Sequence, residues 1–373
     1  MHGRMIAGLP AVALTVTLGA GLLGFEPGPV TIAAGEQDGG VPRFEVDPSW
    51  PSIPNDWVLG QTSSVTVGPD DTIWVLHRPR TVAEDQGTAA PPVLAFEQDG
   101  TFVRAWGGPG DGYDWPANEH GIHVASDGNV WIGGNSAAPE SDDMLLKFTP
   151  EGELLLQIGG RARSSGNDDT VNPMRPAESF VHAATNEVFV ADGYGNRRVI
   201  VFDADTGEYK RMWGAFANTP VAPSEAGGEP DDRGGAPQFG IVHGIEVSSD
   251  GLVYVADRGN SRVQVFDLDG AYRTQGFVNR GDESSSTVAG LAFSPDAEQR
   301  FMYSADQGNS HIHVIDRATL EVLDTFGDNG AAPGEFQALH HLASDSDGNL
   351  YTAEAQRGRR AQKFTFTGMA STR

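Results

Sequence analysis

Three histidines recur at one position of a repeated sequence unit. Each unit holds a short apolar strand, a turn, and a second strand with an aromatic residue at its centre. Eleven residues before that aromatic, the second, fourth and sixth units have His120, His243 and His340. The same position is Ser63 in the first unit and Glu178 in the third. Matched positions in alternate units suggest that the three imidazoles act together.

A divalent metal is the ligand that such a set of histidines fits. In a closed ring of six units, alternate units are about a third of a turn apart, so side chains facing the axis would converge. Zinc binds imidazole nitrogen, and three protein ligands leave a fourth position for water or substrate. We therefore predict a Zn²⁺ site at His120, His243 and His340. The alternative is that these histidines only form turns or core hydrogen bonds.

The remaining histidines lack this matched position. His123 and His341 are expected to point away from the axis, because side chains alternate along a strand. His182, His311 and His313 have no partner in the repeat and are expected to be structural.

A second set of chemically capable residues follows the aromatic strands. Arg78 and Arg258 come four residues after the central aromatic, and Tyr194 comes five residues after it. An arginine offers a bidentate fork to a substrate carboxylate, and a tyrosine beside a metal could act as a general base. The alternative is that the segments around them are only turn motifs of the repeat.

The repeat itself predicts the fold. Helical periodicity is nearly absent after residue 45, and each unit reads as four strands. The central aromatics, 48 to 65 residues apart, are Trp74, Trp131, Phe189, Tyr254, Tyr303 and Tyr351. This pattern predicts an all-β, six-bladed β-propeller with four-stranded blades. A strand around 44–46 is expected to close the last blade, whose own repeat ends early at 364–366.

Composition excludes several classes of function. The 373 residues carry a formal net charge of −26 and include no cysteine. Nucleic acid and anionic membranes would be repelled, and thiolate metal sites, disulfides and cysteine nucleophiles are excluded. We expect a monomer that acts on a small-molecule or peptide substrate carrying a carboxylate.

The N-terminal segment differs from the rest of the chain. A short basic start precedes a nearly continuous apolar run over 5–23, and small residues follow at 31–34. We predict a signal peptide at 1–34, a linker at 35–43, the propeller at 44–367 and a tail at 368–373, in a secreted or periplasmic protein. A retained membrane anchor is the alternative.

The repeats resemble NHL repeats, as in the segment 255–266, and their exceptions resemble one branch of that superfamily, the peptidyl-α-hydroxyglycine α-amidating lyases. The likeness extends over residues 44–366. The segments that carry it are 60–78, 120–122 with 127–129, 192–194, 238–258, and His340 with 347–351.

This resemblance implies a function. It implies a zinc ion on His120, His243 and His340, and catalytic or substrate-binding roles for Tyr194, Arg78 and Arg258. The implied reaction splits an N-acyl-α-hydroxyglycine into a primary amide and glyoxylate.

The sequence also departs from that family. The family has a disulfide cysteine beside the tyrosine, where this chain has Gly195, and an aspartate that helps to bind a structural Ca²⁺, where this chain has His341. Calcium binding is therefore left open. Two other functions also stay open, a metal-dependent hydrolase of lactones or esters and a non-catalytic extracellular scaffold.

Overall fold

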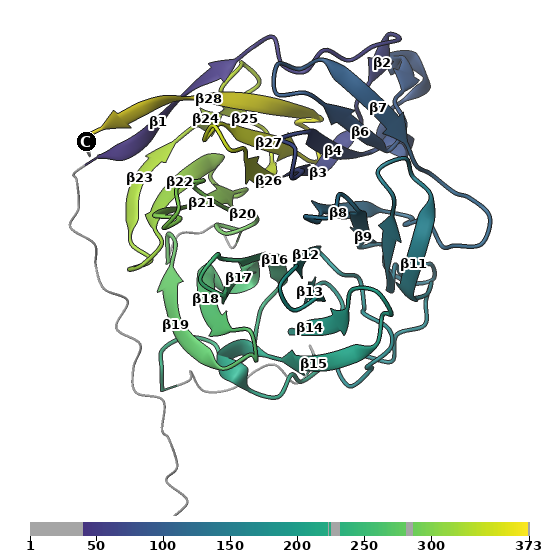
Figure 1. Cartoon of the computed structure of the whole chain (residues 1–373), viewed down its shortest axis with the longest axis vertical. Coiled ribbons are helices and arrows are strands. Elements are labelled where there is room, and N and C mark those ends of the chain that lie inside the picture. The colour runs from purple at the N-terminus through teal and green to yellow at the C-terminus, as the bar shows by residue number, and fades with distance from the viewer. Residues whose placement is uncertain (1–39, 223, 225–231, 281–285, 372–373) are drawn as a thin grey trace, which may run out of the picture. The chain divides into compact units, whose positions relative to one another are not determined.

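Six four-stranded antiparallel sheets surround a common axis in the part of the chain that the structure describes (Figure 1). The computed structural model describes residues 40–371, except 223, 225–231 and 281–285. The sheets form a β-propeller, so the predicted fold class is confirmed. The predicted signal peptide at 1–34 lies outside the described residues. Among the described residues, none of the helices has the length and apolar character needed to span a bilayer.

Each blade runs from an inner strand beside the axis to an outer strand. Blade one consists of β3 (Gln61–Val67), β4 (Ile73–Arg78), β6 (Val93–Phe96) and β7 (Phe102–Trp106). Blade two consists of β8 (Glu119–Val124), β9 (Val130–Gly134), β10 (Met144–Phe148) and β11 (Leu154–Gly159). Blade three consists of β12 (Glu178–His182), β13 (Glu187–Asp192), β14 (Arg198–Asp203) and β15 (Tyr209–Trp213).

The second half of the ring repeats this order. Blade four consists of β16 (Val242–Val247), β17 (Leu252–Asp257), β18 (Arg262–Asp267) and β19 (Tyr272–Phe277). Blade five consists of β20 (Leu291–Phe293), β21 (Phe301–Asp306), β22 (His311–Asp316) and β23 (Val322–Phe326). Blade six consists of β26 (Leu339–Ser344), β27 (Leu350–Glu354), β28 (Arg360–Ala370) and β1 (Val41–Asp47).

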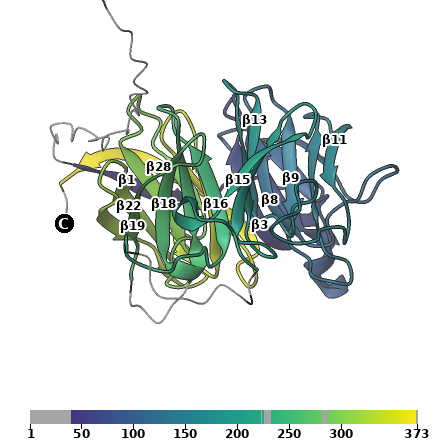
Figure 2. The same cartoon turned by 90° about the horizontal axis from the view of Figure 1, so that it is seen from below.

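Short elements lie in the connections. Two parallel pairs are formed by β2 (Trp57–Val58) with β5 (Thr88–Ala89) and β24 (Asp328–Asn329) with β25 (Glu335–Phe336). The 3₁₀ turns described are η1 (Pro79–Thr81), η2 (Glu84–Gln86), η3 (Ala215–Ala217) and η5 (Arg258–Asn260). Figure 2 shows the inner strands from the side, running along the axis.

Blade six joins the two ends of the described chain. β1 pairs antiparallel with β28, and Phe44 lies opposite Phe366 while Val46 lies opposite Phe364 (Figure 1). This is the pairing that the sequence predicts. Because cysteine is absent, the ring closes without a disulfide, through backbone hydrogen bonds, packing and side-chain hydrogen bonds such as that from Lys363 Nζ to the Gln98 carbonyl oxygen at 2.7 Å.

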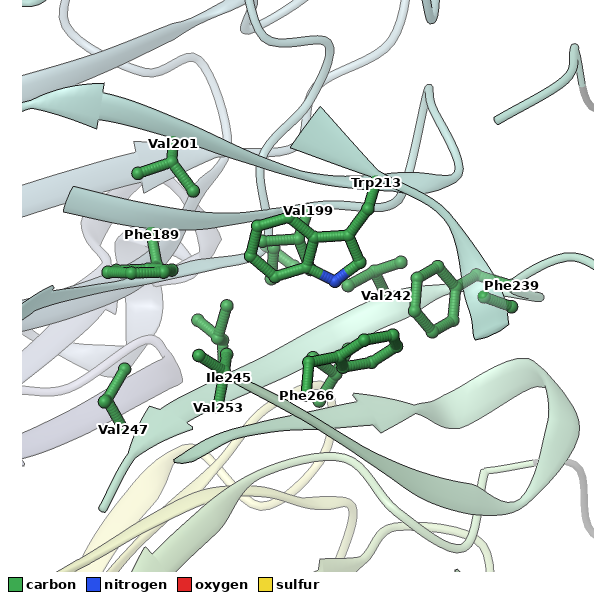
Figure 3. Close-up of a cluster of buried hydrophobic side chains, with 14 of the residues drawn as sticks. Phe189, Val199, Val201, Trp213, Phe239, Val242, Ile245, Val247, Val253 and Phe266 are labelled. Carbon is green, nitrogen blue, oxygen red and sulfur yellow. The ribbon is translucent and has the colours of Figure 1, made fainter. Parts of the chain in front are cut away.

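Apolar side chains fill the spaces between neighbouring blades. Between blades three and four, Phe189 and Val201 face Ile245 and Val253, and the ring of Trp213 lies beside them (Figure 3). Fully burying one such side chain contributes roughly 1.5–3 kcal/mol. One blade leaves an apolar face that only its neighbour covers, so the inner strands that carry the site are held in place by the whole ring.

Candidate metal centre

Bulges in the inner strands set the positions of the three histidines. The strand register shifts at His243 in β16, at His340 in β26, and at His120 with Gly121 in β8. A fourth shift occurs at Ser63 in β3. A β-bulge leaves a residue outside the ladder and redirects its side chain. The matched position seen in the sequence is therefore the bulge position of the inner strand.

The structure brings His120, His243 and His340 together at the axis. Their ring centroids lie 4.9 Å (His120 to His243), 4.7 Å (His120 to His340) and 4.8 Å (His243 to His340) apart. One nitrogen from each ring lies within 4.8 Å of the others. All three side chains are buried. The group could hold a metal ion, as the sequence spacing indicates.

Each of these histidines is oriented by the blade that follows it. The Nδ1 atom lies within hydrogen-bond distance of a backbone carbonyl oxygen in every case: 2.8 Å from His120 to Ala177, 2.6 Å from His243 to Ala289 and 2.6 Å from His340 to Ser63. A carbonyl oxygen only accepts, so Nδ1 carries the proton and Nε2 keeps its lone pair. Metal-bound histidines are typically oriented by such a contact.

Burial keeps the three imidazoles neutral. It lowers the pKa of His120, His243 and His340 well below the ordinary value of 6.5. Charge repulsion acts in the same direction, from the Arg258 guanidinium on His243 and, when His340 is protonated, from His340 on His120. Neutral imidazole is the form that binds a metal, so these side chains need not lose a proton at neutral pH.

Tyr194 lies directly beside two of the histidines. Its phenolic oxygen is 3.0 Å from Nε2 of His120 and 3.1 Å from Nε2 of His243. The backbone of its loop approaches β16 so closely that a Cβ at Gly193 would lie 2.1 Å from the carbonyl oxygen of Val242. Glycine is therefore required there, and this close approach places the phenol over the histidine cluster.

A buried ion pair braces the Tyr194 loop. Asp192 accepts hydrogen bonds from Arg198 Nε at 2.8 Å, from Asn196 Nδ2 at 2.8 Å and from the Met174 backbone at 2.7 Å. Both ionic side chains are completely buried. These contacts tie the two ends of the loop together, so it is held without the disulfide of the resembling family.

A second buried ion pair, between Asp257 and Arg262, supports Arg258 in the next blade. Asp257 accepts from Arg262 Nε at 2.8 Å, from Asn260 Nδ2 at 2.7 Å and from the Gly240 backbone at 2.7 Å. Arg258 begins η5 between these partners, and its guanidinium carbon lies 5.4 Å from the centre of the Tyr194 ring.

Arg78 approaches the centre from blade one. Its Nε donates to the Glu119 carbonyl oxygen at 2.8 Å, and Nη1 donates to Gln61 Oε1 at 2.8 Å. Burial lowers its pKa to about 10, so the guanidinium stays charged at neutral pH. It depresses the pKa of both His120 and His340 through its charge. The structure thus gathers all six residues predicted for the site.

Arg175 is a neighbour that sequence reasoning missed. Its guanidinium carbon lies 5.6 Å from the Tyr194 ring centre, and Nη1 donates to the Tyr194 carbonyl oxygen at 3.3 Å. Arg175 lies in a connection before blade three rather than at a repeat position, so no spacing marks it.

The predicted orientation of His341 is wrong. Its ring centroid lies 4.7 Å from that of His340, 5.3 Å from His243 and 5.6 Å from His120. The bulge between Leu339 and His341 breaks the alternation of side chains, so consecutive histidines both face the axis. Burial lowers the pKa of His341 to about 3.

The other histidines have structural contacts. His123 points away from the axis and accepts a hydrogen bond from the Val181 backbone at 3.1 Å. His313 contacts Asp306 Oδ2 at 3.0 Å, and His182 contacts the Thr185 hydroxyl at 2.9 Å.

The donor set fits a divalent transition metal. Three neutral imidazoles whose Nε2 atoms carry lone pairs suit zinc, copper, iron or nickel. Calcium prefers carboxylate and carbonyl oxygens, and His341 presents nitrogen at the position where the resembling family has an aspartate.

Fold and site together define a β-propeller with a buried histidine cluster, and the chain is similar to known propeller and NHL-repeat proteins. The family model for the NHL repeat matches residues 239–266. The chain is also similar in fold to a solved streptogramin B lyase, with 13% identity, a TM-score of 0.50, and coverage of 87% of this chain and 98% of that one.

Proteins similar to this chain in sequence include an NHL repeat-containing protein and amidating enzymes. NHL repeat-containing protein 3 of Mus musculus is 28% identical over 280 residues, which are 74% of this chain and 70% of that protein. Peptidyl-glycine alpha-amidating monooxygenase B of Xenopus laevis is 25% identical over 338 residues, 84% of this chain and 34% of that protein. A probable peptidyl-alpha-hydroxyglycine alpha-amidating lyase of Caenorhabditis elegans is 23% identical over 241 residues, 64% of this chain and 62% of that protein. The chain therefore resembles NHL-repeat propellers, the amidating lyases among them.

Proposed function

We propose that this protein is a zinc-dependent lyase that cleaves the C–N bond of an N-acyl-α-hydroxyglycine. The observation that carries the proposal is the position of the Tyr194 phenol, 3.0 Å and 3.1 Å from Nε2 of His120 and His243. A potential proton acceptor thus lies at the face of the histidine cluster.

The substrate's two functional groups match the groups around the cluster. A carboxylate would bind the charged guanidinium groups of Arg78 and Arg258, which lie near the histidines from blades one and four. The neighbouring hydroxyl would then lie beside the Tyr194 oxygen. Positioning both groups at once favours cleavage at the carbon that carries them.

The reaction needs no water and no redox partner. Tyr194, in its phenolate form, accepts the hydroxyl proton, the O–H electron pair forms the C=O bond of glyoxylate, and the C–N electron pair leaves with the amide nitrogen. A proton returned to that nitrogen gives the primary amide, so atoms and charges balance. A Zn²⁺ ion held by His120, His243 and His340 would supply Lewis-acid activation of the hydroxyl.

The cellular setting is part of the proposal. The apolar N-terminal segment supports a secreted or periplasmic protein. The net charge of −26 supports a function without nucleic acid, and we propose a monomer.

Product analysis tests the reaction. The zinc-loaded protein is incubated with an N-acyl-α-hydroxyglycine, and glyoxylate and primary amide are both quantified. The lyase predicts one glyoxylate per amide. Release of the free N-acyl acid instead would indicate hydrolysis, and bound metal without either product would contradict the lyase.

A further inference from the structure

Arg175 is a third guanidinium group beside the candidate metal centre, after Arg78 and Arg258. Its guanidinium carbon lies 5.6 Å from the centre of the Tyr194 ring, and that of Arg258 lies 5.4 Å from the same point. Nε of Arg175 donates to the Asn135 carbonyl oxygen at 3.0 Å. Asn135 comes four residues after the central aromatic of blade two, which is the position of Arg78 and Arg258 in blades one and four. Arg175 therefore brings a positive charge to a repeat position that is neutral in blade two.

None of these three guanidinium groups forms an ion pair with a carboxylate among the described residues. Arg78, Arg175 and Arg258 donate only to carbonyl oxygens and to side-chain amide oxygens. By contrast, Arg198 and Arg262, which brace the loops of the site, each pair with an aspartate. A positive charge that is partly removed from water is stabilised by a counter-charge. The ligand of this site is therefore expected to supply the negative charge.

The guanidinium of Arg175 has one nitrogen without a protein partner. Nη1 donates to the Tyr194 carbonyl oxygen at 3.3 Å, whereas Nη2 makes no hydrogen bond within the described part of the chain and is accessible to solvent. Asp142 lies close by, because its carbonyl oxygen accepts from the Arg175 backbone at 3.1 Å. The Asp142 carboxylate, however, accepts from three other backbone amides and lies 3.6 Å from Arg161 Nη1. Arg175 is thus held by neutral acceptors and keeps donors for an anionic ligand.

The α-hydroxyglycine part of the proposed substrate carries one carboxylate, which the proposed function assigns to Arg78 and Arg258. We propose that Arg175 binds a second anionic group, carried by the acyl part of the substrate, and so makes the enzyme selective for N-acyl-α-hydroxyglycines with an acidic acyl group. In a chain of net charge −26, three unpaired positive charges at one site also attract such a substrate. The inference rests on the proposed function and adds a substrate class to it.

Matched substrates test this selectivity in the wild type. N-acetyl-glutamyl-α-hydroxyglycine and N-acetyl-glutaminyl-α-hydroxyglycine differ only by a carboxylate in place of a carboxamide, and the aspartyl and asparaginyl compounds form a second pair. Glyoxylate release by the zinc-loaded full-length chain gives kcat/KM for each compound. We expect the acidic member to be preferred about tenfold at low salt in one or both pairs. The preference should shrink at about 0.5 M salt, because salt screens charges near the surface.

Substitution of Arg175 assigns the preference to its guanidinium. The readout is the ratio of kcat/KM for the acidic and neutral members, because a general loss of activity lowers both values alike. Arg175→Gln should reduce the ratio to about one, whereas Arg175→Lys, which keeps the charge without the planar fork, should keep part of it. Arg163→Gln is the charge-matched control from the same connection. A Cβ at Gly160 would lie 2.9 Å from Arg163 Cδ, so this side chain packs beside the end of the outer strand β11, and the wild-type ratio should remain.

Binding of uncleavable analogues supplies a readout without turnover. N-acetyl-glutamylglycine and N-acetyl-glutaminylglycine lack the hydroxyl, so calorimetry measures Kd with no reaction. The acidic analogue should bind about tenfold more tightly to wild type, and Arg175→Gln should remove the difference.

The outcomes separate this inference from the proposed function. Equal kcat/KM for both members of each pair in wild type would overturn the role of Arg175 and leave the lyase standing. A preference that Arg175→Gln retains, or that Arg163→Gln removes equally, would do the same. Absence of glyoxylate from all four substrates would overturn the proposed function, and the calorimetric comparison would then still decide whether Arg175 binds the second anionic group.

Discussion

Nδ1 of His340, on the last blade, lies 2.6 Å from the backbone carbonyl oxygen of Ser63 on the first blade. This contact spans the seam at which the ring closes, and equivalent contacts join blade two to three and blade four to five. The atoms that orient the candidate ligands are thus the atoms that join neighbouring blades. Metal binding and closure of the ring should be coupled.

Metal should therefore stabilise the fold. An ion that binds only the folded chain adds about 4 kcal/mol to the free energy of unfolding when present at a thousand times its Kd. We expect Zn²⁺ to raise the Tm of the chelator-treated protein by several degrees, as measured by calorimetry. His243→Ala is the control, in which zinc should leave the Tm unchanged. The same response in both proteins would contradict the coupling.

Removing the Tyr194 hydroxyl should separate chemistry from metal binding. Tyr194→Phe keeps the ring that packs against Arg258 but loses the proton acceptor. We expect turnover to fall by about 10²- to 10⁴-fold with one bound metal retained. Steady-state kinetics and metal analysis on the same sample check this. Near-normal kcat in Tyr194→Phe would exclude Tyr194 as the base.

Arg258 should act mainly on substrate binding. Its Nη1 donates to Gln307 Oε1 over 3.5 Å, whereas Arg78 makes two hydrogen bonds of 2.8 Å. The Arg258 guanidinium is therefore less constrained than that of Arg78. Arg258→Lys keeps the charge but loses the bidentate fork, and we expect KM to rise about tenfold with a smaller change in kcat. Arg273→Lys, at an exposed ion pair of blade four, is the control. An unchanged KM would remove Arg258 from the carboxylate site.

The buried pair of Asp192 and Arg198 should be needed to hold Tyr194. Asp192→Asn leaves the Arg198 guanidinium buried without a counter-charge, which costs about 3–5 kcal/mol. Urea unfolding should show this loss, and activity should fall more than metal content. Asp205→Asn removes an exposed carboxylate from its pair with the buried Lys147, which keeps its hydrogen bond to the Ala204 carbonyl oxygen, and should cost under about 1 kcal/mol. Equal effects of the two substitutions would contradict the bracing role.

Acid should destabilise the protein through its buried histidines. Burial lowers the pKa of His77 from 6.5 to about 4. Between these values the unfolded chain binds a proton at His77 that the folded chain does not, so stability present above pH 6.5 is lost as the pH falls. This difference amounts to about 2 kcal/mol at pH 5. Urea unfolding at pH 7.5 and pH 5 should show a smaller acid-induced loss for His77→Gln than for wild type. Equal losses would show that His77 titrates normally in the folded state.

The propeller fold and the convergence of the site residues on the axis could both be predicted from the sequence. Both follow from the repeat, because equal positions in successive blades take equal places around the axis. A count of positions finds the bulge residues His120, His243 and His340 without knowledge of the bulge. The same count fails for His341, because its orientation depends on a local shift of register that breaks the period of two. Arg175 could not be predicted as a neighbour of Tyr194, because it lies in a connection between blades, where the position of a side chain depends on tertiary contacts. The sequence contains Asp192 and Arg198, but it does not show that they form a buried ion pair that holds the Tyr194 loop in place of a disulfide.

The most direct test of the account is the dependence of glyoxylate release on the histidine-bound metal. Metal-free wild type and metal-free His243→Ala are titrated with Zn²⁺, and glyoxylate formed from an N-acyl-α-hydroxyglycine is measured at each point. We predict activity that rises to a plateau at one zinc per wild-type chain, and no activity at any zinc concentration for His243→Ala. Full activity of the metal-free wild type, or of His243→Ala, would contradict the account.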